Sequence, residues 1–134
     1  MMMSNEKIYA KQRLLRLIKS FSEQNKEIIL VSLCTTDGFP IEHISIDKLS
    51  TEIDKLAAIS STFSALSYSS ARQMNQGQCD ITIIEATYGN ILFFKASYLG
   101  ESCVLTVVAN LKMALAIARY KTKNLAADIA AIAG

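Results

Sequence analysis

Three short apolar segments near the C-terminal end constrain the fold more than any other feature of the chain. They read "CDITIIEAT" (79–87), "ILFFKASY" (91–98) and "CVLTVVA" (103–109), and only 88–90 and 99–102 separate them. β-Branched and aromatic residues in runs of this length are typical of strands. Parallel neighbours would need a crossover of a dozen or more residues, so connections this short predict an antiparallel meander.

A second strand pair is predicted earlier in the chain. The apolar run "EIILVSLCTT" (27–36) is followed by Asp37-Gly38 and then by "FPIEHISI" (39–46). Asp tolerates positive φ and Gly has no Cβ, which favours a tight hairpin turn between antiparallel strands. Because Pro40 has no N–H to donate to a sheet, we expect the second strand to lie at an edge.

Helical periodicity fills the remaining segments. Apolar residues recur at helical spacing over 7–21, over 50–76 and again from position 111 onward. Ser50 is a candidate N-cap for the middle helix, Gly77 is placed to end it, and Asn110 is a candidate N-cap for the last helix. The predicted order is therefore α–β–β–α–β–β–β–α.

This order predicts an α+β fold with five strands in one antiparallel sheet. The strands are apolar on both sides, so both faces of the sheet must be covered. Three helices are available, and we expect the long middle helix on one face and the two terminal helices on the other. The 134 residues are enough for one domain, 1–134, with its own core.

Composition favours an intracellular protein. The N-terminal residues "MMMSNEK" lack a signal-peptide pattern, and no apolar stretch is long enough to span a membrane. Cys34, Cys79 and Cys103 are widely spaced and odd in number, so we expect them to be reduced, buried strand residues in the cytoplasm. No disulfide framework or zinc site is predicted.

Charge is distributed unevenly although the net charge is only +2. Residues 1–27 carry six Lys and Arg against three acids, 110–134 carry four against one, and the middle of the chain is acidic. Two basic ends would attract nucleic acid or an acidic lipid surface. Solvated cations on amphipathic helices explain the same pattern, and we favour that interpretation.

The chemistry needed for an enzyme is missing from the sequence. His43 is the only histidine, and no phosphate-binding glycine motif occurs. Glu52 and Asp54 fall on different sides of a helix, so they do not form a paired acid–base site. We therefore predict a protein that is not an enzyme, binds no cofactor or metal and does not bind nucleotide by itself.

Four segments follow one another over about 28–120, namely "VSLCTTDGFPI", "IDKLAAISSTFSAL", "ITIIEATYGNILFF" and "CVLTVVANLKMALAIARY". With this ordered set the chain resembles the Roadblock dynein light-chain family, and 1–27 is an added N-terminal helix. The resemblance implies the strand order 2-1-5-4-3. Lys112 departs from the pattern, because a glycine often follows "ANL" in the family.

The resemblance also implies a homodimer in which strand 79–87 pairs with its mate beside the paired middle helices, 50–76. The residues agree, because this predicted edge carries isoleucines and neither lysine nor proline, and an apolar edge is an aggregation hazard unless it is covered. The alternative is that Asp80 and Glu85 alone protect the edge. The residues predicted at the dimer interface are Ile59, Leu66, Ile81 and Ile83.

What the family implies for function is a platform for protein binding. Several members bind small GTPases, and the bacterial Mgl-type member activates one. We therefore expect a Ras-like small GTPase as partner, with Arg72 as the one arginine on the partner side; the others are Arg13, Arg16 and Arg119. A solvated helix charge is the alternative interpretation of Arg72, and the one that we favour for a single arginine. The alternatives are a structural dimerisation module without effect on nucleotide turnover, or nucleic acid or lipid binding by the basic helices.

Overall fold

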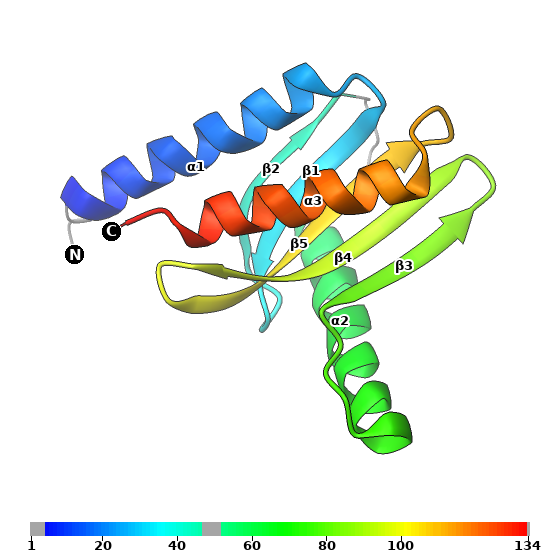
Figure 1. The fold of residues 1–134 in the computed structure, drawn as a ribbon. Coiled ribbons are helices and arrows are strands. Elements are labelled where there is room, and N and C mark those ends of the chain that lie inside the picture. The colour runs from blue at the N-terminus through cyan, green and yellow to red at the C-terminus, as the bar shows by residue number, and fades with distance from the viewer. Residues whose placement is uncertain (1–4, 47–51, 134) are drawn as a thin grey trace.

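The computed structural model describes residues 5–46 and 52–133 and confirms the predicted order of elements (Figure 1). The elements are α1 (Asn5–Gln24), β1 (Ile28–Thr35), β2 (Pro40–Ser45), α2 (Ile53–Asn75), β3 (Ile81–Ala86), β4 (Gly89–Tyr98), β5 (Glu101–Asn110) and α3 (Leu115–Ala130).

The five strands form one antiparallel sheet in the order β2-β1-β5-β4-β3, as predicted. β5 is central, so residues 103–107 are buried on both faces. β2 and β3 form the two edges. Pro40 begins β2 and is exposed, which agrees with its inability to donate to a neighbouring strand.

The helices cover the two faces unequally. α1 and α3 lie together on one face and α2 crosses the other (Figure 1). The residues buried beneath α1 and α3 form a large apolar cluster that includes Leu14, Ile18, Leu105 and Ile129. The cluster beneath α2 contains only four buried residues, which are Cys34, Ala57, Phe93 and Val104.

The β1–β2 turn differs from the expected two-residue form. Gly38 has φ of +92°, whereas Asp37 does not adopt positive φ. The Gly38 N–H donates to the Thr35 carbonyl, and the Thr35 N–H donates to the Phe39 carbonyl. This geometry is that of a turn followed by a glycine bulge, which takes up the extra residue between the strands.

Two glycines of the β3–β4–β5 meander are required for different physical reasons. At the β4–β5 turn both Leu99 (φ +51°) and Gly100 (φ +78°) are left-handed, so a leucine occupies a position that favours glycine. Gly89 serves close packing instead, because a Cβ there would meet the Ala109 carbonyl oxygen on β5. The glycine therefore allows β4 to pair with β5 at this end.

Two predicted helix caps are wrong and a third lies outside the described residues. Asn110 is the last residue of β5, and its side chain accepts a hydrogen bond from the Lys112 N–H in the turn before α3. α3 starts only at Leu115. The left-handed residue that ends α2 is Gln76, so Gly77 follows it. Ser50 is not among the described residues.

The helical stripes are narrower than the sequence pattern predicts. In α1 the buried side chains recur every fourth residue, at Ala10, Leu14, Ile18 and Ser22. Ile8 and Leu15 belong to the apolar residues that recur over 7–21, but they are more than two-fifths exposed. Leu111, expected on the α3 stripe, precedes that helix and is 62% exposed. Each helix therefore keeps apolar side chains in solvent.

Candidate protein–protein interface

Only the first part of α2 is buried against the sheet. The buried residues of the helix are Leu56, Ala57 and Ser60, all within its first eight residues. From Ser61 to Asn75 every side chain is at least partly exposed. Figure 1 shows the C-terminal half of α2 extending away from the strands. A helix of this length would be buried along one stripe if the sheet were long enough beneath it, so α2 leaves apolar surface unused.

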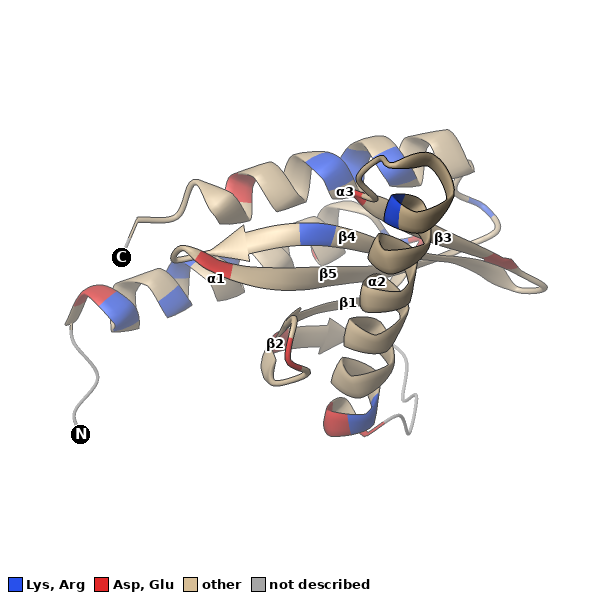
Figure 2. Cartoon of the chain, turned by 90° about the horizontal axis from the view of Figure 1, so that it is seen from below, with Lys and Arg blue, Asp and Glu red and all other residues tan. Residues whose placement is uncertain are grey.

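One flank of α2 carries an exposed apolar row. Ile59, Phe63 and Leu66 follow at the i, i+4 and i+7 spacing that places side chains on one side of a helix, and Met74 continues the row two turns later. Leu66 is 61% exposed and Met74 is 85% exposed. From Leu56 to Ala71 the helix has no charged residue (Figure 2). An uncharged apolar surface of this kind is characteristic of a protein-binding site.

Polar and aromatic contacts hold α2 on the sheet. Thr106 Oγ1 of β5 donates a hydrogen bond of 2.8 Å to Ser60 Oγ, and both residues are buried. The Phe63 ring stacks on Phe93 of β4 with centroids 5.6 Å apart. A buried hydrogen bond contributes only about 1 kcal/mol net, because it replaces hydrogen bonds to water. The attachment of α2 therefore depends on few groups.

Arg72, the predicted partner-binding residue, lies on another side of α2 from Leu66. Its guanidinium is 5.7 Å from the centre of the Tyr68 ring, and Nη1 donates a long hydrogen bond of 3.4 Å to the Tyr68 hydroxyl. Lys95 of β4 approaches the same ring at 5.5 Å. Tyr68, Arg72 and Lys95 thus form an exposed cation–aromatic cluster, which the sequence does not predict because α2 and β4 contribute to it together.

The free edge of β3 presents the backbone groups of alternate residues. Asp80 accepts a hydrogen bond from the Lys95 N–H, which fixes the even-numbered residues as those paired with β4. In an antiparallel pair the residues between them point their N–H and C=O groups the other way. Ile83 and Glu85 therefore present unpaired backbone groups along this edge, and so does the Ile81 N–H, whereas the Ile81 carbonyl accepts a hydrogen bond of 3.2 Å from Cys79 Sγ.

The four residues predicted at the dimer interface do not form one patch. The side chains of Ile59 and Leu66 are exposed on α2. Those of Ile81 and Ile83 pack on the opposite face of the sheet, against the core under α1 and α3. Ile84 is the β3 isoleucine that packs on the α2 face. Their assignment to an interface stays a prediction, and only the edge backbone of β3 connects the two pairs.

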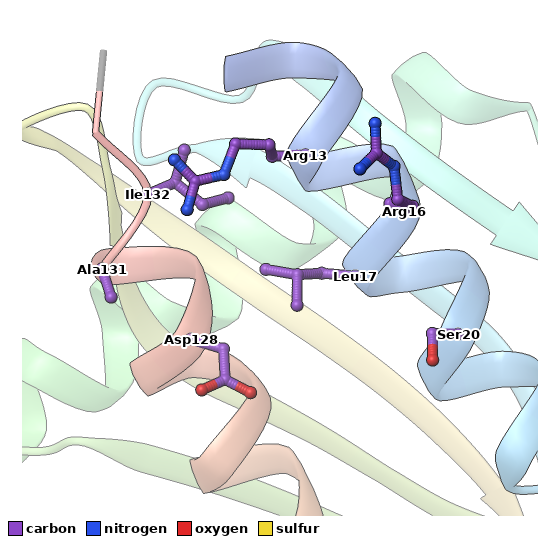
Figure 3. Close-up of a pocket in the computed structure, with 7 residues that line it drawn as sticks. All are labelled: Arg13, Arg16, Leu17, Ser20, Asp128, Ala131 and Ile132. Carbon is purple, nitrogen blue, oxygen red and sulfur yellow. The ribbon is translucent and has the colours of Figure 1, made fainter. Parts of the chain in front are cut away.

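The other arginines lie on the terminal helices, which carry most of the Lys and Arg residues (Figure 2). Arg13 and Arg16 line a cavity of about 620 Å³ between α1 and α3, with Leu17 below them and Asp128 on the opposite wall (Figure 3). Arg119 lies beside β3 instead. The cavity between α1 and α3 therefore presents both signs of charge.

The cysteines and the histidine do not gather into one reactive site. Cys34 and Cys103 are buried in strands, and burial raises the pKa of each thiol to about 11, so both are protonated at neutral pH. Cys79 is half-buried and precedes β3 instead of lying in a strand. His43 is exposed on β2.

No cluster of His, Cys, Asp and Glu among residues 5–46 and 52–133 is suited to a metal ion. Within the same ranges, no helix has the length and apolar character needed to cross a bilayer.

Solved structures provide the comparison with known proteins. No protein-family model matches the chain, and neither does any curated protein. The structure of MglB from Myxococcus xanthus is similar, with a TM-score of 0.80 and 14% identity over 97% of this chain and 91% of that one. An MglB structure described as having a tetrameric arrangement has a TM-score of 0.75 and 16% identity over 92% and 90%. A Roadblock/LC7 domain from Streptomyces avermitilis has a TM-score of 0.73 and 18% identity over 85% and 92%.

These comparisons identify the fold class of the chain. It has the Roadblock/LC7 fold, which the resemblance of its sequence segments predicted. More narrowly, the MglB structures match it from α1 to α3, so the fold is MglB-like.

Proposed function

We propose that this protein is a cytoplasmic, non-enzymatic homodimer that binds a Ras-like small GTPase. The observation that carries the proposal is the uncharged, exposed apolar row on α2, in a chain whose fold is that of MglB. The sequence resemblance supplies the class of partner, because several members of the Roadblock family bind small GTPases.

The edge of β3 supports the homodimer. Three isoleucines in four residues make it apolar, and no lysine or proline of β3 opposes pairing with another strand. A two-fold axis through paired β3 edges would join two sheets into one and would bring both copies of α2 to the same face. The two apolar rows would then form a single surface at the centre of the dimer.

A proline at position 85 tests the dimer. Glu85 is exposed and its N–H points away from β4, so Glu85→Pro removes one edge donor without breaking the β3–β4 ladder, whereas Glu85→Ala keeps that donor. We expect Glu85→Pro to shift the mass from dimer to monomer in size-exclusion chromatography with light scattering, and Glu85→Ala to remain a dimer. Ile83→Lys is a less specific test, because Ile83 packs with the core.

The cation–aromatic cluster at the end of α2 tests the GTPase partner. Tyr and Arg dominate the binding energy of many interfaces, so we expect Arg72→Ala to weaken binding about tenfold. The neighbouring variant Gln73→Ala is the control, because Gln73 is also exposed but lies outside the cluster. Binding is measured by calorimetry with each purified Ras-like GTPase of the source organism, loaded with GDP or with a non-hydrolysable GTP analogue.

Two outcomes separate the proposal from its alternative. A wild-type dimer that binds none of these GTPases in either nucleotide state would favour a structural dimerisation module. If a GTPase binds, turnover assays decide whether hydrolysis changes. Arg72 is held by Tyr68, so we expect any change to come from reorganising the GTPase's own residues.

A further inference from the structure

A second cavity lies between α3 and the free edge of the sheet. It has a volume of about 630 Å³, and α3 lies over the neighbouring strands (Figure 1). Its floor includes Ile83 of β3 and its wall is one flank of α3. The residues that line it are Ile83, Leu115, Ala116, Arg119, Tyr120 and Lys123.

This cavity combines an apolar floor with a basic wall. Arg119 and Lys123 are one helical turn apart and both are exposed, and neither forms an ion pair with a residue of the described chain. Lys121 and Asp128 line cavities on the α1 side of the helix instead. Glu85 is the acidic residue on the same face of β3, so the positive charge exceeds the negative charge here.

One copy of the chain supplies only half of this site. If two β3 edges pair as proposed above, the wall of each α3 faces the wall of the other across a floor made by both copies of β3. Each α3 packs mainly over β4, so three strand spacings of about 4.8 Å would put the helix axes about 14 Å apart. Helices are about 10 Å wide, which leaves a trough of about 4 Å between them.

We propose that this trough binds an extended acidic segment of a partner protein, in which Asp or Glu alternates with apolar residues. Neighbouring strands lie about 4.8 Å apart, so a trough of this width is close to that of one extended backbone and far too narrow for a helix about 10 Å wide. Residues four apart on α3 are separated by about 6 Å along the axis, close to the 6.6 Å between alternate residues of a strand. Acidic side chains would pair with Arg119 and Lys123, and the apolar ones between them would contact Ile83.

This proposal rests on the proposed dimer, and it adds a ligand that the α2 surface does not require. A bound acidic segment would also neutralise the four cations that the two α3 helices bring together. We therefore expect the segment to strengthen dimerisation, because it binds the dimer and not the single chain.

The test uses a fluorescein-labelled peptide of four Glu-Leu repeats and follows its fluorescence anisotropy at 0.1 M salt. We expect the double variant Arg119→Glu/Lys123→Glu to bind this peptide at least about tenfold more weakly, since several weak ion pairs are lost together. The matched control is Arg16→Glu/Lys19→Glu, which makes the same change in charge on exposed positions of α1 and should bind within about twofold of wild type. Circular dichroism verifies that both variants are folded.

Three results with the variants and the other ligands would overturn the proposal. They are equal binding of a block peptide with four Glu followed by four Leu, equal loss in the α1 control, or binding of phosphatidylserine vesicles with the same dependence on Arg119 and Lys123. The last result would make this face a lipid-binding surface. Failure of wild type to bind the peptide would also reject the trough.

The dimer is measured separately so that the two failures can be told apart. We expect Glu85→Pro to lose peptide binding and Glu85→Ala to keep it. If wild type is a dimer but does not bind the peptide, the proposed trough is wrong and the proposed dimer still stands. A monomer that binds the peptide rejects both the dimer and the composite site.

Discussion

The two faces of the sheet are built from the same strands, but the amount of apolar side chain buried under the covering helices differs between them. Alternate residues of β5 illustrate this, because Leu105 and Val107 enter the large core under α1 and α3, whereas Val104 and Thr106 face α2. Burying a side chain such as leucine contributes about 1.5–3 kcal/mol. The first face has many such side chains, and the second has few.

The difference shows which face stabilises the single chain and which face leaves surface exposed for a partner. The α1–α3 face buries aliphatic side chains throughout its centre, so it accounts for most of the stability of one chain. The α2 face depends on a small cluster and one buried hydroxyl pair, and its helix leaves apolar side chains exposed. A surface that is incompletely buried in one chain is available for a second.

The largest expected difference is between two matched leucine truncations. Leu14 on α1 is fully buried in the large core, whereas Leu56 on α2 is buried near the start of its helix. We expect Leu14→Ala to lower the free energy of unfolding by about 4 kcal/mol and Leu56→Ala by about 2 kcal/mol. Urea unfolding followed by circular dichroism, in the Glu85→Pro background, measures both without a contribution from dimerisation. Equal losses would contradict the comparison of the two faces.

The alkylation rates of two buried cysteines report local opening on the two faces of the sheet. Cys34 faces α2 and Cys103 faces the α1–α3 core, and both have zero exposure. Because burial raises both thiol pKa values to about 11, each is protonated at pH 8, and alkylation requires the covering helix to open.

We expect iodoacetamide to modify Cys34 at least about tenfold faster than Cys103, a difference of about 1.4 kcal/mol in opening free energy. Mass spectrometry of peptides from timed samples gives both rates, with half-buried Cys79 as the rapid internal reference. Faster labelling of Cys103 would mean that α2 is the more firmly attached cover.

The smallest effect concerns the hydroxyl pair under α2. Ser60→Ala leaves the Thr106 hydroxyl buried without the partner to which it donates, so we expect a loss of about 1–2 kcal/mol. The double variant Ser60→Ala/Thr106→Val removes both polar groups and should cost less than the single change. Thermal unfolding of the two variants and of Thr106→Val alone gives the coupling. A coupling of zero would mean that this contact does not hold α2.

Much of the fold could be predicted from local patterns. The short connections between strands required antiparallel pairing, and Pro40 required an edge. These are backbone constraints that act between near neighbours, so they can be read without knowing what lies across the sheet. The same locality explains the errors at helix ends, since Asn110 suits an N-cap but its backbone is already paired in β5.

The candidate interface was predicted less well. The periodicity of α2 continues through Phe63 and Met74, and it indicated one buried stripe along the whole helix. The structure buries only the first part, because burial depends on where the sheet lies beneath the helix. Serines mixed into the stripe, such as Ser67 and Ser70, were a signal that its second half is not core.

The sequence by itself determined the elements, their order and the antiparallel pairing, because turn length and side-chain period constrain each segment separately. Only the tertiary structure decided which isoleucine of β3 faces which helix, since a strand that is apolar on both sides contains no signal for either face. It also decided that Tyr68, Arg72 and Lys95 meet, and that Arg119 and Lys123 stand over Ile83. These groups come from different elements, and their proximity is a product of packing.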